Sequence, residues 1–92
     1  MIMEHVRQWT AQVYISEHDD GTTSAEVRLQ TVDGHQLVGH GGARCNPNDP
    51  EVPEIGDELA VARALADLSD RLIHATVADL EGVTHTRVHL RS

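Results

Sequence analysis

The chain has 92 residues, of which 39% are hydrophobic and 2% aromatic, and its 15 acidic residues outnumber 7 arginines, with no lysine. A chain of this length forms one domain, and its formal net charge of -8 repels phosphate polymers and anionic membranes at long range. The single cysteine excludes an intramolecular disulfide, and no stretch approaches the roughly 20 apolar residues of a membrane span, so we expect a cytoplasmic protein with no membrane contact.

Three segments in the first half of the chain alternate between apolar and polar residues, which is the pattern of half-buried β-strands. They cover residues 9–15, 23–31 and 36–42. Asp33-Gly34 lies between the second and third segments and predicts a tight hairpin, because such a turn needs positive φ. The sequence therefore predicts an antiparallel meander with one apolar face that another element must cover.

The segment from Glu54 to about Leu80 predicts one long helix, which Gly82 should end. Its apolar residues fall into two neighbouring sectors. The first contains Ile55, Leu59, Ala62, Ala66, Ile73, Val77 and Leu80, and the second contains Val61, Leu65, Leu68 and Leu72. We expect one sector to cover the sheet and interpret the second as a spare face for a dimer or another partner. The alternative is a single broad core face.

The end of the chain, "VTHTRVHLRS", alternates again and predicts a short C-terminal strand. One of its faces carries His85, Arg87, His89 and Arg91, which would form a basic ridge on an acidic chain. Together with Arg44, these residues are candidate contacts for nucleic-acid phosphates or an acidic partner. The alternative is an edge strand whose charges only discourage aggregation.

The segment "NPNDPEVPEIGDELA", residues 46–60, concentrates prolines and carboxylates. Proline and acidic residues are typical of a helix entrance, where carboxylates meet the positive end of the helix dipole. The alternative is a catalytic or metal site that uses Glu54, Asp57 or Glu58. The sequence contains no Ser/His/Asp order, HExxH or P-loop pattern, so we expect no catalytic residue, metal, cofactor or small-molecule substrate.

His85 and His89 are four residues apart, which on a strand separates them by about 13 Å, too far for one metal ion. Cys45 falls in a predicted loop. It is a candidate reactive thiol or cross-dimer disulfide, and the alternative is a cysteine without a role.

The segment "GHGGARCNPNDPEVPEIGDELAVARALADLSDRLIHAT", with the upstream "EHDDGTTSAEVRL" and "DGHQLVGHG", resembles a family of short actinobacterial proteins. That family is catalogued as a domain of unknown function with a fold similar to the double-stranded-RNA-binding domain. Its relatives include mycobacterial proteins of the dormancy response. The resemblance runs from about Trp9 to Leu80, and the chain departs from the family pattern at Cys45, where a second arginine usually follows Arg44.

The resemblance implies a β-β-β-α domain of the α+β class, a homodimer, and a likeness in shape to ribosome-hibernation factors. It provides no catalytic residues. We therefore expect a single domain over residues 1–92, with its core at 9–80 and a C-terminal extension at 82–92. The functional expectation is a non-enzymatic, stress-linked dimer that binds ribosomes or structured RNA. The alternative is a protein-interaction module that uses the apolar helix face and has no nucleic-acid role.

Overall fold

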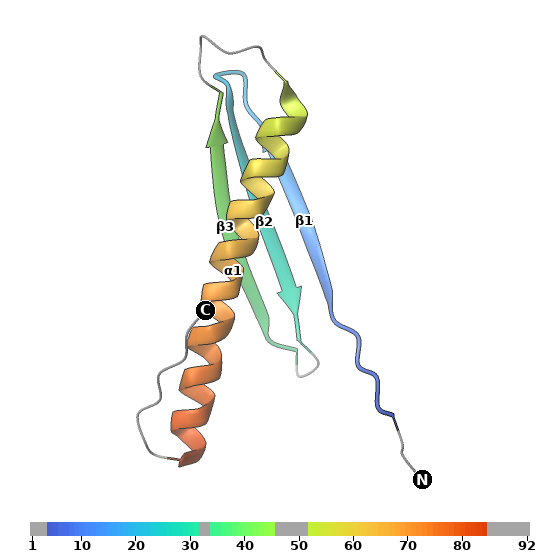
Figure 1. Cartoon of the computed structure of the whole chain (residues 1–92), viewed down its shortest axis with the longest axis vertical. Coiled ribbons are helices and arrows are strands. Elements are labelled where there is room, and N and C mark those ends of the chain that lie inside the picture. The colour runs from blue at the N-terminus through green and yellow to red at the C-terminus, as the bar shows by residue number, and fades with distance from the viewer. Residues whose placement is uncertain (1–3, 32–33, 46–51, 85–92) are drawn as a thin grey trace.

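The computed structural model describes residues 4–31, 34–45 and 52–84. Within them, a three-stranded antiparallel sheet of order β1-β2-β3 precedes one long helix that crosses one face of the sheet (Figure 1). The elements are β1 Thr10–Glu17, β2 Thr22–Gln30, β3 Gln36–Arg44 and α1 Pro53–Thr84. This arrangement confirms the α+β class and the meander-then-helix order predicted from the alternating segments.

Glycines with positive φ lie in both hairpin turns. Gly21 has φ +83° in the β1–β2 turn, and Gly34 has φ +86° in the β2–β3 turn. The second value confirms the turn predicted there, and the Thr31 N–H donates to the His35 carbonyl oxygen at 2.9 Å to close it. In the first turn, the Asp20 carboxylate accepts hydrogen bonds from the hydroxyl and the backbone N–H of Thr22. These turns fix the register of all three strands.

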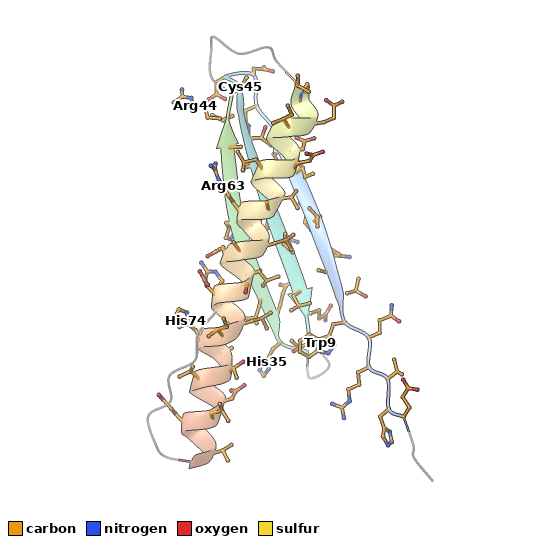
Figure 2. The ribbon with its side chains drawn as sticks, in the orientation of Figure 1. Trp9, His35, Arg44, Cys45, Arg63 and His74 are labelled. Atoms are coloured by element: carbon orange, nitrogen blue, oxygen red, sulfur yellow. The ribbon has the colours of Figure 1, made fainter. Side chains whose placement is uncertain are left out.

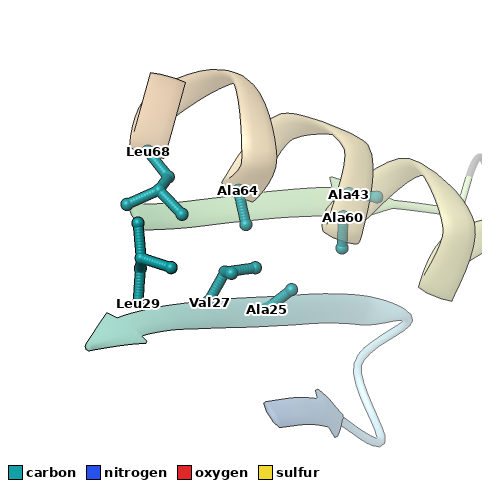
Figure 3. Close-up of a cluster of buried hydrophobic side chains, with 7 residues drawn as sticks. All are labelled: Ala25, Val27, Leu29, Ala43, Ala60, Ala64 and Leu68. Carbon is teal, nitrogen blue, oxygen red and sulfur yellow. The ribbon is translucent and has the colours of Figure 1, made fainter. Parts of the chain in front are cut away.

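The core is a thin layer of small and medium side chains between the sheet and α1 (Figure 3). The alternating residues of β2 that were predicted to face inward are buried there, and Val27 is fully buried. Leu37 of β3 and the helix residues Val61 and Leu72 pack against the cluster. Its buried members are Ala25, Val27, Leu29, Ala43, Ala60, Ala64 and Leu68.

Two glycines on β3 bring the helix unusually close to the sheet. A Cβ atom on Gly41 would lie 2.3 Å from the Ala64 nitrogen and 2.4 Å from the Ala60 carbonyl oxygen. A Cβ atom on Gly39 would lie 2.3 Å from the Ala64 carbonyl oxygen. Residues two apart on a strand and residues four apart on a helix are both separated by about 6–7 Å. The spacing of Gly39 and Gly41 on β3 therefore matches the spacing of Ala60 and Ala64 on α1. Backbone contact at these glycines therefore sets which side of α1 faces the sheet.

The expectation of a spare face at Val61, Leu65, Leu68 and Leu72 is wrong for three of these residues. Leu68 is only 5% exposed in the core, and Val61 and Leu72 pack against that core, whereas Leu65 remains 47% exposed. The first sector instead lies outside the buried side of α1: Ile55 and Ile73 are each nine residues, or two and a half turns, from Ala64. The reason is that Ala60 and Ala64, small enough to meet the glycines, determine the buried side.

Helix α1 leaves the apolar side chains of strand β1 exposed. Val13 and Ile15 face the helix side of the sheet, opposite Val27 and Ala25 of β2, yet they are 45% and 44% exposed. The prediction that one element covers the whole apolar face therefore holds for β2 and β3 only. A single helix is about 10 Å wide, close to two strand spacings, so it cannot bury three strands.

The helix continues through Gly82 to Thr84, so the prediction that Gly82 ends it is wrong. The first two residues of the predicted C-terminal strand, Val83 and Thr84, are helical, and its remaining residues lie outside the described part of the chain. Because a Cβ on Gly82 would meet no atom within 4 Å, Gly82→Ala should stabilise the protein by about 0.5–1 kcal/mol through the higher helix propensity of alanine. Urea denaturation of the two proteins measures this difference, and a destabilised variant would contradict a helical Gly82.

Candidate functional site

The polar side of α1 closes the outer edge of β3. The Asp67 Oδ2 atom accepts a hydrogen bond from the His40 backbone N–H at 2.8 Å, and Arg63 Nη1 donates to the Gly42 carbonyl oxygen at 2.7 Å. These are outward-facing backbone groups of an edge strand, which would otherwise be open to another strand. The side of α1 next to β3 is therefore used for edge protection.

Arg71 completes this arrangement by pairing with Asp67 at 3.1 Å, as its spacing of four residues predicts. The His40 N–H, and then the Arg71 side chain, lower the pKa of Asp67 below its usual value of 3.8. Arg63, which is also four residues from Asp67 along the helix, donates to the β3 backbone instead. Arg63 and Arg71 are thus both engaged within the domain.

A cavity of about 650 Å³ lies where the β1–β2 turn, the end of β3 and the start of α1 meet. Its lining includes Glu17, His18, Arg44 and Cys45 (Figure 2 shows the last two at this end of the sheet). His18 Nε2 lies 3.3 Å from the Ser24 hydroxyl, on an exposed face of the hairpin. The cavity thus gathers acidic, basic and thiol side chains at one end of the sheet.

Two carboxyl groups meet beside this cavity. Glu17, at the end of β1, lies within hydrogen-bonding reach of Asp57 in α1, and this neighbour, with a smaller effect of Glu54, raises the pKa of Glu17 above its ordinary 4.5. Within the described residues, Asp57 Oδ1 is buried without a hydrogen-bond partner. Protonation of Glu17 would supply the missing donor. The pair is a point of repulsion at neutral pH, because no cation among the described residues bonds to it.

We expect Glu17→Gln to raise the melting temperature at pH 7. Because the pKa of Glu17 is raised in the folded protein, protonated Glu17 contributes stability below about pH 4.5. That stability is lost as the pH rises through the folded-state pKa, where Glu17 becomes a carboxylate beside Asp57. Glutamine removes one charge and can donate to Asp57. Thermal melts between pH 3 and pH 8 should show the advantage of the variant shrinking as the pH falls. An equal advantage at every pH would contradict the carboxyl pair.

An apolar stripe runs along α1 outside the side that Ala60, Ala64 and Leu68 bury, and its first two residues, Ile55 and Leu59, also line the cavity. Ile55 is 62% exposed and Leu59 is 41% exposed, while Ile73 is partly buried. Most residues of the stripe follow one another at intervals of four, three or seven, the spacing with which one helix packs on another. We call these residues the outer stripe: Ile55, Leu59, Ala62, Ala66, Ile73, Val77 and Leu80. They are the first sector of the sequence analysis, now on the exposed side.

The candidate phosphate contacts do not gather into one described surface. Arg44 is exposed at the end of β3, near Asp20, whose pKa is lowered mainly by the hydrogen bonds from Thr22 and least by the charge of Arg44. Arg28 bonds to Glu26 at 2.6 Å and lies 4.5 Å from the centre of the Tyr14 ring. The other four candidates, His85, Arg87, His89 and Arg91, lie outside the described residues. Among those described, Arg44 is the one predicted contact that can be placed.

Sequence reasoning missed the edge protection by Asp67 and Arg63 and the contact between Glu17 and Asp57. Each joins residues that are distant in the chain, so local patterning held no direct signal for it. The contact of Gly39 and Gly41 with the side of α1 that contains Ala60 and Ala64 could have been predicted, because small residues at matching spacing on a strand and a helix are typical of close packing. A helix placed with Ala60 and Ala64 against β3 also has Asp67 beside that strand, because Asp67 follows Ala60 by about two turns.

Within residues 4–31, 34–45 and 52–84, no group of three or more His, Cys, Asp or Glu side chains is arranged to hold a metal ion. Nor does any helix in this part of the chain combine the length and apolar character needed to cross a membrane. Glu54, Asp57 and Glu58 lie near the start of α1, which begins at Pro53 as a helix entrance should. The described part of the acidic segment, residues 52–60, thus lies at the start of a helix, as predicted.

Comparisons with known proteins agree with this architecture. The model of the Rv2632c-like family matches residues 7–89. The chain is 50% identical to the uncharacterised protein Mb1767 of Mycobacterium bovis over 95% of this chain and 92% of that protein. It is 48% identical to the uncharacterised protein Rv2632c of Mycobacterium tuberculosis over 92% of this chain and 90% of that protein. The crystal structure of Rv2632c superposes with a TM-score of 0.79 at 47% identity, covering 91% of this chain and 99% of that one.

Proposed function

The chain belongs to the Rv2632c-like family, and from this premise we propose that it is a non-enzymatic, homodimeric protein-binding module that uses the outer stripe of α1. The observation that carries the proposal is the exposure of large apolar side chains on α1, Ile55 and Leu59 above all, which also line the cavity at the start of this helix. Contiguous exposed apolar surface on a soluble protein typically marks an interaction site. The resemblance to proteins of the dormancy response makes a stress-linked role part of the proposal.

The spacing of the outer stripe favours a helical partner. Apolar residues at intervals of three and four form a ridge that fits the groove of a second helix. Ala62 and Ala66 lie in the middle of the stripe, where their small side chains allow a partner helix to approach closely. Because polar and charged groups are few along this ridge, burial of apolar surface would supply most of the binding energy.

Affinity capture with immobilised protein tests this function. We expect Leu59→Glu to remove the captured partner and to leave the fold intact, because Leu59 is exposed. Val6→Glu is the matched control, since Val6 is 80% exposed, apolar and distant in sequence from the outer stripe. Equal capture by wild type and Leu59→Glu, with both folded by circular dichroism, would contradict a role for the stripe.

Ribosome or structured-RNA binding is the second candidate. The exposed side chain of Arg44, for which no hydrogen bond to another described side chain is identified, favours it, as does the resemblance to hibernation factors. Recognition of double-stranded RNA needs several cations in register along one surface. Arg28, Arg63 and Arg71 are engaged within the domain, and the chain carries a net charge of -8. This candidate predicts that Arg44→Glu weakens ribosome binding.

A further inference from the structure

The two edges of the sheet are treated differently by the rest of the domain. At the β3 edge, Asp67 and Arg63 occupy outward-facing backbone groups of His40 and Gly42. At the β1 edge, none of the hydrogen bonds identified in residues 4–31, 34–45 and 52–84 joins a side chain to the strand's outward-facing backbone. β1 is therefore the open edge, eight residues long and exposed on both faces.

The direction of each backbone group in β1 follows from the ladder with β2. The His18 N–H donates to the Thr22 carbonyl oxygen at 2.8 Å, and in an antiparallel pair every second residue bonds toward the same neighbour. Gln12, Tyr14 and Ser16 therefore bond toward β2, in register with Arg28, Glu26 and Ser24. The N–H and C=O groups of the residues between them, Ala11, Val13 and Ile15, point outward from the sheet.

We propose that the open β1 edge pairs with β1 of a second copy, antiparallel about a two-fold axis at Val13, to form a continuous six-stranded sheet. This interface gives a location to the homodimer of the proposed function and rests on it. In this register Val13 exchanges both hydrogen bonds with the partner's Val13, and Ala11 pairs with the partner's Ile15. The apolar side chains of both copies then form one strip on the helix side of the sheet.

Charge and register argue for a second copy at this edge. Copies of a chain with net charge -8 repel each other, so contact is favoured where charge is absent. Residues 10–16 of β1 carry no formal charge, and an axis at Val13 pairs these residues only with one another. Moving the axis to Tyr14 would place Glu17 opposite Ala11 and bury a carboxylate against apolar surface. The axis at Val13 keeps Glu17 at the end of the ladder.

The proposed pairing also explains why Val13 and Ile15 are apolar although α1 does not cover them. A two-fold axis perpendicular to the sheet places both α1 helices on the same face, so the dimer presents two outer stripes in one direction. A partner that contacts both stripes would gain avidity without new contacts. The dimer edge and the partner surface are separate, so each can be altered without the other.

Cysteine cross-linking tests the register. In a Cys45→Ser background, Val13→Cys should form a covalent dimer on mild oxidation, because paired Cα atoms lie about 5.5 Å apart, within disulfide range. The matched control is Ile15→Cys, on the same strand and face, which lies about 13 Å from its own copy in this register. Efficient cross-linking of Ile15→Cys, or none of Val13→Cys, would overturn the axis at Val13.

Analytical ultracentrifugation tests the edge itself. Val13→Pro removes an outward N–H without breaking a bond to β2, so the dimer should dissociate about tenfold more readily or worse while the monomer stays folded. Val13→Lys provides a second variant, which brings two like charges together at the axis. Dimers of unchanged affinity in both variants would overturn the proposal. A monomeric wild type would overturn the homodimer as a whole. Partner capture by Leu59→Glu is a separate result, which tests the outer stripe and not the β1 edge.

Discussion

Replacing Gly41 with alanine is expected to destabilise the protein strongly, although it adds a single methyl group. The new Cβ would lie 2.3 Å from the Ala64 nitrogen and 2.4 Å from the Ala60 carbonyl oxygen, so the whole helix would have to move away from β3. Overpacking of a core costs about 1–3 kcal/mol, and we expect the upper end or beyond because both clashes involve backbone. The melting temperature should fall by more than about 10 °C.

Gly42→Ala is the control for this prediction. It changes the neighbouring residue of the same strand in the same way, but its Cβ would meet its nearest atom, the Thr23 carbonyl oxygen, at 3.5 Å. The general effect of removing a glycine from a strand is thus common to both variants. Thermal melts followed by circular dichroism should separate the two proteins clearly. A Gly41→Ala variant as stable as Gly42→Ala would contradict the close contact of α1 with β3.

Leu68→Ala is expected to cost about 2–5 kcal/mol, because it removes a buried side chain and leaves a cavity beneath the helix. Leu68 is 5% exposed and packs with the cluster that includes Leu29 and Ala64. The matched change Leu65→Ala lies almost one turn away on the same helix, at a position that is 47% exposed. We expect this control to change the free energy of unfolding by about 0.5 kcal/mol or less.

Urea denaturation of the two leucine variants decides which side of α1 faces the sheet. The difference between them should exceed the error of extrapolation to zero denaturant. If Leu65→Ala were the more costly change, the helix would be rotated relative to the structure described above. Equal costs would indicate the broad core face that the sequence also allowed.

The sheet could be predicted from the sequence because its signals are local. Alternation placed Ala25, Val27 and Leu29 on one face, and Gly34 marked the second hairpin. Strand ends differ from the predicted ones by two residues at most. In each case the information lay within a few neighbouring residues, where side-chain direction follows directly from the strand period.

The orientation of the helix could not be predicted in the same way. Ranking its faces by large apolar side chains favours the sector of Ile55 and Leu59, whereas close packing is decided by the small residues Ala60 and Ala64. The burial of a helix face depends on the surface it meets, and Gly39 and Gly41 make that surface flat. Helical periodicity alone contains no information about the opposing strand.

The candidate site was harder to predict than the fold, since its contacts are tertiary. The bond from His40 to Asp67 joins residues 27 positions apart, and Glu17 meets Asp57 only because the β1–β2 turn and the start of α1 lie at the same end of the sheet. A charge count treats every arginine alike. The structure separates Arg63 and Arg71, which are engaged within the domain, from Arg44, which is exposed.

Co-sedimentation with purified 70S ribosomes at about 50 and 200 mM salt tests most directly whether partner contact is apolar rather than phosphate-based. Wild type, Arg44→Glu and Leu59→Glu would be compared at both salt concentrations. An apolar contact through the outer stripe predicts that wild type and Arg44→Glu behave alike and that any pelleting is insensitive to salt and lost in Leu59→Glu. Stoichiometric pelleting of wild type that falls steeply with salt, or is lost in Arg44→Glu, would contradict it.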